Sequence, residues 1–390
     1  MNKESYVVNE DYLKKVLLEL LAIPCPTGFT DRAVVYVCEH LKELGVEFEL
    51  MRRGTIRAKV PGAQHYPGRA VVTHLDTIGA MVREIKPNGR LAITPVGHWS
   101  SRFSEGARVT VFSDQRRFRG SVLPLMAAGH AFNEAIDTQP VSWDQVEIRV
   151  DEPIKHSMDA DAAGIQVGDF VAFDPNPEFL SNGYIVSRHL DNKAGVACVL
   201  TALKTLRDYN LPVPFDCFPI FTLSEEVGSG ASHALHEDIT EFVGVDIGPV
   251  ANGQNAQEFG VTVAIKDSSG PFDYHLTRHL LNICQQQQIP HQRDVFRFYY
   301  SDAISAVQAG HDIRHALLTF GTDATHGYER THMSALNAVT STLVHYMLSQ
   351  PTVSSDRLQH ATLSDFTHQL ATDDIPPSEG THLPDPKQLF

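Results

Sequence analysis

Apolar residues recur at helical spacing in two stretches near the start of the chain. Between Asn9 and Leu21 they fall on one helical face, and Pro24 and Pro26 should end that helix. A second apolar stripe follows and runs into Gly45, a residue type at which helices often stop. The pattern therefore predicts two amphipathic helices at the beginning of the fold.

Short apolar runs of strand length come next, and further helical patterns separate them in the second half of the chain. Strands alternating with helices predict an α/β domain with a mainly parallel sheet flanked by helices. The runs interpreted as strands of this sheet are Val46–Met51, Thr55–Val60, Arg69–Thr73, Phe215–Leu223, Glu241–Asp246, Val295–Tyr300 and Ala316–Phe320. A further strand is expected to begin at Gly183 and to lead into a helix, with Asp191 at the junction.

Between residues 81 and 180 the helical periodicity disappears, and short β-like runs alternate with turns. Closely spaced strands predict a small β-barrel or sandwich inserted into the α/β domain. Within this insertion, Met126–Gln139 fits either a helix or a loop. The candidate strands are Leu91–Val96, Ala107–Ser113, Phe118–Leu123, Gln145–Val150 and Asp169–Phe173.

These changes of pattern divide the chain into three parts. Residues 1–80 and 181–350 are expected to form the α/β domain, and residues 81–180 the β-rich insertion. Residues 351–390 mix Pro, Asp, Ser, Thr and His, which predicts a flexible tail.

Composition narrows the possible partners. The net charge of -15, from 47 acidic and 32 basic residues, argues against nucleic acid and anionic membranes as partners. The N-terminal residues show no export signal, and no apolar stretch approaches the ~20 residues of a membrane span, so we expect a cytoplasmic protein. The five cysteines lie scattered in apolar segments, which suits reduced core thiols.

Two adjacent carboxylates, Glu225 and Glu226, follow the most apolar predicted strand. Neighbouring residues at a strand end point in different directions, so one carboxylate can bind a metal while the other reaches a water molecule. Taken alone, such a pair in a Gly-rich turn is more often ordinary solvated surface. The interpretation therefore depends on partners from other strands.

Such partners are present. His74, Asp191, Asp246 and His332 each come just after another predicted strand, and the carboxyl ends of parallel strands meet at one sheet edge. Any one of them has an ordinary alternative, since Asp191 also suits a helix cap and strand ends are generally polar. Together with Glu225 and Glu226, the imidazoles and carboxylates suit two zinc-like ions that share one carboxylate.

Five segments of the chain resemble, in order, the motifs of the M42 family of metallo-aminopeptidases, which includes glutamyl aminopeptidases and the tetrahedral TET peptidases. The segments are HLDTIG at 74–79, LDNKAG at 190–195, LSEEVG at 223–228, VDIG at 245–248 and RTHMS at 330–334. The sequence also resembles a branch of this family associated with the osmolyte N-acetylglutaminylglutamine amide.

The resemblance implies a site with two divalent ions, zinc in the first place, with cobalt and manganese also compatible with these ligands. Asp191 would bridge the ions, His74 and Asp246 would complete the ligands of one ion, and Glu226 and His332 those of the other. The site would belong to a di-zinc exopeptidase-like fold.

The catalytic roles come from the same resemblance. Glu225 matches the general base, and Asp76 matches the acid that orients His74. The insertion would be a PDZ-like dimerisation domain, so homo-oligomers from dimer to dodecamer are expected. His326 is interpreted as a loop histidine, and Asp302 as a residue that supports the site.

Three positions depart from the family pattern: Thr77 replaces a Glu, and Asn192 and Lys193 stand where many members have Asp and Arg. These changes alter the charge beside the ligands and leave the ligand set intact.

The sequence thus predicts an enzyme that removes the N-terminal residue from peptides. One alternative is a specialised amide hydrolase acting on a small acylated or amidated dipeptide, related to the osmolyte. The other is a non-catalytic oligomeric scaffold that keeps the fold.

Overall fold

The computed structural model describes residues 6–352, and the predicted tail beyond Thr352 lies outside this range. The chain begins with the two predicted helices, α1 (Glu10–Leu21) and α2 (Asp31–Leu44). The Asn9 side chain caps α1, and α2 ends at Gly45, whose left-handed φ of 69° suits glycine.

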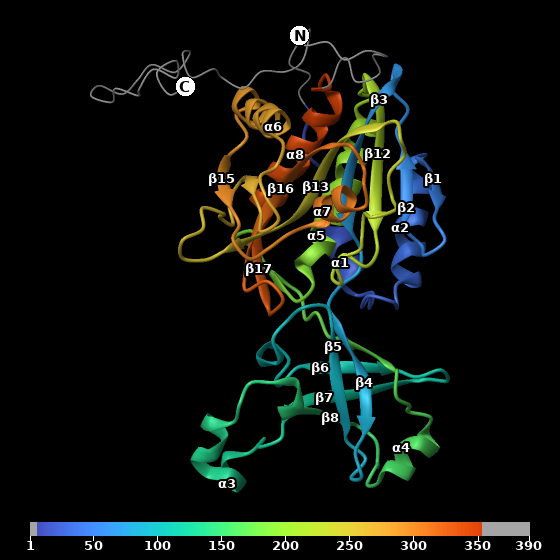
Figure 1. The fold of residues 1–390 in the computed structure, drawn as a ribbon, viewed down its shortest axis with the longest axis vertical. Coiled ribbons are helices and arrows are strands. Elements are labelled where there is room, and N and C mark those ends of the chain that lie inside the picture. Colours follow the sequence, from blue (N-terminus) through green and yellow to red (C-terminus); the bar gives the residue numbers. More distant parts are fainter. Residues whose placement is uncertain (1–5, 353–390) are drawn as a thin grey trace, which may run out of the picture. The chain divides into compact units, whose positions relative to one another are not determined.

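Four parallel strands form the centre of the large sheet, in the spatial order β12-β3-β13-β16 (Figure 1). Their side chains are buried almost throughout, which explains why the sequence shows continuous apolar runs instead of alternation. The bounds are β3 (Gln64–His74), β12 (Phe215–Thr222), β13 (Ile239–Val250) and β16 (Arg314–Asp323).

Antiparallel strands extend this centre on both sides, so the sheet is mixed and has 11 strands within the described residues. The outer strands are β1 (Glu47–Leu50), β2 (Ile56–Lys59), β10 (Glu178–Phe179), β11 (Tyr184–Ser187), β14 (Val261–Lys266), β15 (His291–Val295) and β17 (Glu329–His332). The strand predicted at Val295–Tyr300 is wrong, because β15 precedes it and β15 pairs with β14 from His291 onwards.

Helices cover both faces of the sheet. Val71 and Val245 pack on one face into a core with residues of α1, α2, α5, α6 and α8, whereas Ala70 and Val72 pack on the other with residues of α7. The predicted class, an α/β fold with a sheet flanked by helices, is confirmed. The remaining helices of the sheet domain are α5 (Leu190–Asp208), α6 (Tyr274–Gln287), α7 (Asp302–Gln308) and α8 (Met333–Leu348).

The predicted insertion contains a closed barrel of antiparallel strands with its own apolar core, in the order β4-β5-β8-β7-β6-β9. The strands are β4 (Gly79–Ile85), β5 (Leu91–Val96), β6 (Arg108–Phe112), β7 (Arg117–Pro124), β8 (Val146–Val150) and β9 (Phe170–Phe173).

Short helical turns connect the barrel strands. The undecided stretch Met126–Gln139 contains two of them, α3 and the 3-10 turn η2, instead of one helix. The short elements are η1 (Ser101–Phe103), α3 (Gly129–Phe132), η2 (Asn133–Thr138), η3 (Trp143–Gln145) and α4 (Ser157–Ala163).

A buried arginine joins the middle of β3 to the end of α8. Arg69 is 0% exposed and donates to the backbone oxygens of Tyr346 and Ser349, with its guanidinium 4.8 Å from the centre of the Tyr346 ring. The Tyr346 hydroxyl in turn donates to Glu241 on β13 over 3.0 Å. This network fixes the last helix against two central strands.

Replacing Arg69 by Ala should lower the free energy of unfolding by about 3 kcal/mol, because it leaves buried carbonyl groups without a charged donor. Urea unfolding of both proteins measures the difference. Arg83→Ala is the control, since its ion pair with Asp144 is exposed at both ends and should contribute no more than ~1 kcal/mol. Equal losses in the two variants would contradict the role of Arg69.

Candidate metal centre

The register of the central strands brings the predicted acids and histidine to the same height in the sheet. β12 pairs Thr222 with His74, and β13 pairs Gly244 with Val72. Asp246, two residues beyond Gly244, therefore lies level with His74 at the end of β3. Asp246 stands inside β13 and not after its end, because this strand continues to Val250.

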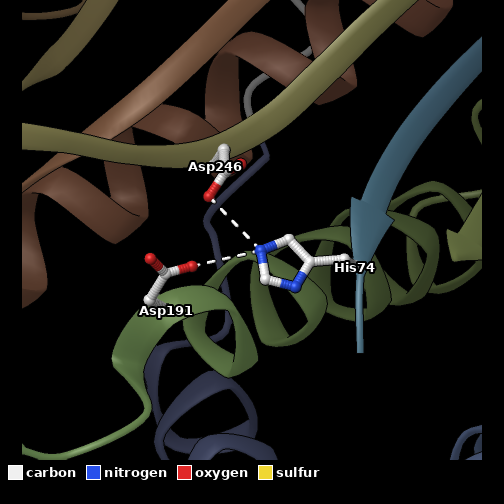
Figure 2. A group of neighbouring side chains, drawn as sticks. All are labelled: His74, Asp191 and Asp246. Carbon is white, nitrogen blue, oxygen red and sulfur yellow. Dashed lines mark hydrogen bonds and ion pairs between the residues drawn. The ribbon is translucent and has the colours of Figure 1, made fainter. Parts of the chain in front are cut away.

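The first group of possible metal ligands consists of His74, Asp191 and Asp246, all buried (Figure 2). His74 Nε2 lies 3.1 Å from an Asp191 oxygen and 3.6 Å from an Asp246 oxygen. His74 Nδ1–H donates to the backbone oxygen of Asp76 over 2.9 Å. This bond places the Nε2 lone pair toward the two carboxylates, as metal binding requires.

The second group consists of Asp191, Glu226 and His326. His326 Nε2 lies 3.4 Å from Asp191 Oδ2 and 3.3 Å from Glu226 Oε2. His326 Nδ1–H donates to the backbone oxygen of His98 over 3.0 Å, which again leaves Nε2 free to act as a ligand. Asp191 turns one carboxylate oxygen to each imidazole, and this is the arrangement of a bridging ligand.

His332 does not belong to either group. Its Nδ1 accepts from the Ser334 backbone N–H over 3.1 Å, and its Nε2 pairs with the backbone oxygen of Asn182 at 2.9 Å. Its ring packs against Tyr184 and Phe259. The structure therefore brings His326, and not the predicted His332, to Asp191 and Glu226.

A chain reversal explains the different positions of His326 and His332. β16 reaches Asp323 in the parallel direction, the chain turns at Ala324 and His326, which both have positive φ, and β17 runs back antiparallel to β11. His326 thus stays at the edge where the parallel strands end, whereas β17 carries His332 away from it. The Thr-His-Gly sequence after the last apolar strand was the available signal for this turn.

Glu225 lies beside the first group. Its Oε2 is 3.8 Å from His74 Nε2, and its backbone N–H donates to Asp76 Oδ1 over 3.3 Å. Asp76 also accepts from the Thr27 hydroxyl over 2.6 Å, while its carboxylate stays 3.7 Å from His74 Nδ1. Asp76 therefore orients His74 through its backbone carbonyl and fixes the Glu225 segment with its side chain.

The buried acids make this region strongly anionic. Burial raises the pKa of Glu225 well above its usual range, with His74 opposing and the Asp246, Asp302 and Glu226 charges adding to the rise. Burial also raises the pKa of Glu226 and Asp246. The carboxylates in turn raise the pKa of His326 to about 12, against the effect of burial.

Crowded buried carboxylates of this kind need a compensating positive charge. Nitrogen and carboxylate oxygen are the donors that zinc and similar divalent ions accept. The residues present therefore fit a pair of divalent ions that share Asp191.

Tyr299 is a residue of this region that the sequence did not indicate, because Val295–Tyr300 was interpreted as a strand. Burial and the Asp246, Glu225 and Asp191 charges raise the pKa of its phenol well above the usual range. Its hydroxyl is buried and forms no hydrogen bond of normal geometry within the described residues.

The three positions that depart from the family pattern are all buried and hold the backbone around the ligands. Asn192 donates to the Val245 oxygen over 2.7 Å, and Lys193 donates to the Leu20 oxygen over 2.9 Å. The Thr77 backbone pairs with Cys25 and Thr27. The Asp191 side chain caps no helix: α5 begins with non-helical dihedral angles at Asp191 and Asn192.

Comparison with known proteins establishes the family of this chain. The family model of the M42 glutamyl aminopeptidases matches residues 54–341. The chain belongs to the M42 peptidase family. As a member, it is an enzyme of the hydrolase class, which confirms the predicted family and enzyme class.

Relatives with known names point the same way. YhfE of Bacillus subtilis (strain 168), whose name places it among aminopeptidases, is 36% identical over 340 residues, which cover 87% of this M42 chain and 98% of YhfE. The glutamyl aminopeptidase of Lactococcus lactis subsp. cremoris is 28% identical over 199 residues, covering 50% of this chain and 55% of the relative.

Solved structures confirm the fold of this M42 chain. A TET aminopeptidase from a marine sediment thaumarchaeote superposes with a TM-score of 0.78 at 17% identity, covering 87% of this chain and 96% of the other. Pyrococcus horikoshii TET1 peptidase gives a TM-score of 0.76 at 21% identity, covering 87% and 100%. Among the described residues, no helix combines the length and apolar character needed to cross a membrane.

Proposed function

We propose that this protein is a di-metal aminopeptidase that cleaves the N-terminal residue from peptides. The observation that carries the proposal is the pair of ligand groups that share Asp191, with the Glu225 carboxylate 3.8 Å from His74 Nε2. A non-catalytic scaffold would have no need for a buried carboxylate that is free to accept a proton beside such groups.

The residues that would hold the ions are His74, Asp191 and Asp246 for one and Asp191, Glu226 and His326 for the other. When bound, two such ions supply Lewis-acid stabilisation of negative charge and lower the pKa of water. Zinc suits these donors best, and cobalt or manganese would also be accepted.

Glu225 is the proposed general base. It does not belong to either ligand group, and burial raises its pKa, which favours acceptance of a proton by the carboxylate. It takes a proton from the attacking water and returns it to the nitrogen of the leaving amine. Asp76 positions it by accepting a hydrogen bond from its backbone N–H.

The neighbouring groups keep this arrangement rigid. Ile78 N–H donates to Glu226 Oε1 over 3.1 Å, and the Thr325 hydroxyl donates to Asp191 Oδ2 over 3.2 Å. Asp302 accepts from Thr222 at the end of β12 and from the Ala231 N–H, which fixes the loop that follows Glu225 and Glu226. Side chains held in this way need little rearrangement during the reaction.

We further propose that residues 81–180 form a separate dimerisation domain of PDZ-like type between the two parts of the catalytic domain, 1–80 and 181–350. The barrel with its own core supports this division. P. horikoshii TET1 is described as assembling into a tetrahedron or a large octahedral shell, and we expect a homo-oligomer here as well. A cytoplasmic location remains a prediction.

Substrate choice is tested with a panel of aminoacyl anilides beside N-acylated dipeptides, with and without a C-terminal amide, each assayed with zinc, cobalt and manganese. We expect turnover of the anilides, which carry a free α-amino group. The kcat/KM for the blocked compounds should be at least about a hundredfold lower, because a site that binds an amine strongly disfavours compounds that lack one. Cleavage of only the blocked dipeptides would replace the aminopeptidase by the specialised amide hydrolase.

A further inference from the structure

The inserted barrel reaches the metal centre through the connection between β5 and β6. Residues 97–99 of this connection follow directly after β5. The backbone oxygen of His98 accepts the hydrogen bond from His326 Nδ1–H over 3.0 Å, although the two residues lie 228 positions apart in the chain. Because a carbonyl oxygen can only accept, the proton of the neutral His326 ring stays on Nδ1. A residue of the barrel thus decides which His326 nitrogen faces Asp191 and Glu226.

The same connection also touches Glu226, a second member of this ligand group. Gly97 has a positive φ of 86°, and a Cβ atom added there would lie 3.5 Å from Glu226 Cβ and 2.9 Å from Ile78 Cγ2. The Ile78 N–H in turn donates to Glu226 Oε1 over 3.1 Å. The backbone at Gly97 therefore passes so close to Ile78 and Glu226 that a side chain would displace one of them.

The turn that carries His326 is held from the barrel side. His326 has a φ of 62°, a left-handed conformation that is unfavourable for a residue with a side chain and that persists where neighbouring groups hold it. The next residue, Gly327, faces Phe103 of η1, since a Cβ atom added to Gly327 would lie 3.2 Å from the Phe103 ring. His98 and Phe103, both in the β5–β6 connection, thus contact this turn.

Trp99 anchors the connection in the barrel. Its side chain is 9% exposed and belongs to the barrel core, where its ring centre lies 4.9 Å from that of Phe173. Trp99 Nε1–H donates to the Gly79 oxygen at the start of β4 over 3.0 Å, and Trp143 Nε1–H donates to the Trp99 oxygen over 3.3 Å. The residue after His98 is therefore fixed through its side chain and its backbone, and the barrel determines where the His98 carbonyl points.

We propose that the β5–β6 connection positions His326 and Glu226 for the second ion, so that the barrel completes the metal centre in addition to its proposed role in assembly. This inference rests on the proposed di-metal function. Loss of a group that supports a metal ligand lowers the metal affinity by about 10–100-fold. The imidazole of the first group is supported by the Asp76 oxygen instead, so the effect should be confined to one ion.

Gly97→Ala, in the full-length protein titrated with Co²⁺, tests this role. The added methyl group would press on Ile78 and displace the neighbouring His98 carbonyl. The affinity for one of the two cobalt ions should fall by about tenfold or more, and the affinity for the other should stay unchanged. The visible absorption of Co²⁺ depends on its coordination geometry, so the spectrum of the weakened ion should change as well. A titration followed by absorption measures both effects.

Gly106→Ala is the matched control, because Gly106 lies in the same connection and has a similar φ of 77°. Among the described residues, a Cβ atom added to Gly106 would meet no atom within 4 Å beyond its chain neighbours. Both substitutions strain the backbone alike, so only Gly97→Ala should alter cobalt binding. Thermal unfolding shows whether the variants fold. Trp99→Phe is a second test: it keeps an aromatic ring, removes the hydrogen bond to Gly79 and should weaken the same ion.

The outcomes separate this inference from the proposed function. If Gly97→Ala and Trp99→Phe bound two cobalt ions with the affinities and spectrum of the natural protein, the inference would be overturned and the di-metal proposal would stand. Equal weakening of both ions, or equal effects of Gly97→Ala and Gly106→Ala, would also overturn it, because the damage would then be general. A natural protein that bound only one cobalt ion would contradict the di-metal proposal and this inference with it.

Discussion

Replacing Glu225 by Gln should lower kcat by about 10²–10⁴-fold, the usual contribution of a positioned general base. The amide keeps the size of the side chain and removes its ability to accept a proton. Because Glu225 lies in neither ligand group, the variant should bind the same amount of metal as the natural protein. Peptidase rates and elemental analysis of the two proteins provide the two measurements.

The matched control for this substitution is Glu237→Gln, an exposed carboxylate outside the site, which should leave both quantities unchanged. Near-normal turnover of Glu225→Gln would show that another group takes the proton. Loss of metal together with activity would show that Glu225 is a ligand, and its role would have to be exchanged with that of Glu226.

Replacing His326 by Ala should remove one ion and with it most of the activity, whereas replacing His332 by Ala should leave the metal content unchanged. His326 Nε2 faces Asp191 and Glu226, while both nitrogens of His332 are used in hydrogen bonds outside the site. Removal of a residue that only supports a metal ligand already lowers the metal affinity by about 10–100-fold. Removal of the ligand itself should lower the affinity for the second ion by more than this.

Metal content per chain and the zinc dependence of the peptidase rate compare these two variants directly. His332→Ala also serves as the control for general damage, since it removes an imidazole at a similar depth from the neighbouring strand. If His332→Ala lost an ion and His326→Ala kept both, the assignment made from the sequence would be right and the one made from the structure wrong.

Much of the fold followed from the sequence because it depends on local patterns. The α1 and α2 stripes, the stop at Gly45 and the apolar runs of β3, β12 and β16 are each visible within a few residues. The strand at β15 was misplaced because His291–Val295 contains only one apolar residue and pairs with β14 through its backbone. Backbone pairing leaves little signal in side-chain type.

In the candidate site, too, some residues could be identified from local sequence patterns and others could not. His74, Glu225 and Glu226 were found because each closes or follows a strongly apolar strand, and strand ends of a parallel sheet share one edge. Asp246 was found because the predicted strand ended at this residue. The observed strand β13 continues to Val250, but Asp246 still lies level with His74.

The sequence by itself thus determined the α/β class, the inserted barrel, the M42 family and most of the acids and imidazoles at one sheet edge. Only the tertiary structure decided which histidine completes the second group, that Asp76 acts on His74 through its carbonyl, and that Tyr299 lies beside Asp246. These facts depend on a chain reversal at residues 324–326 and on contacts between residues far apart in the chain. Spacing along a sequence records neither the direction of a returning strand nor the direction of a side chain.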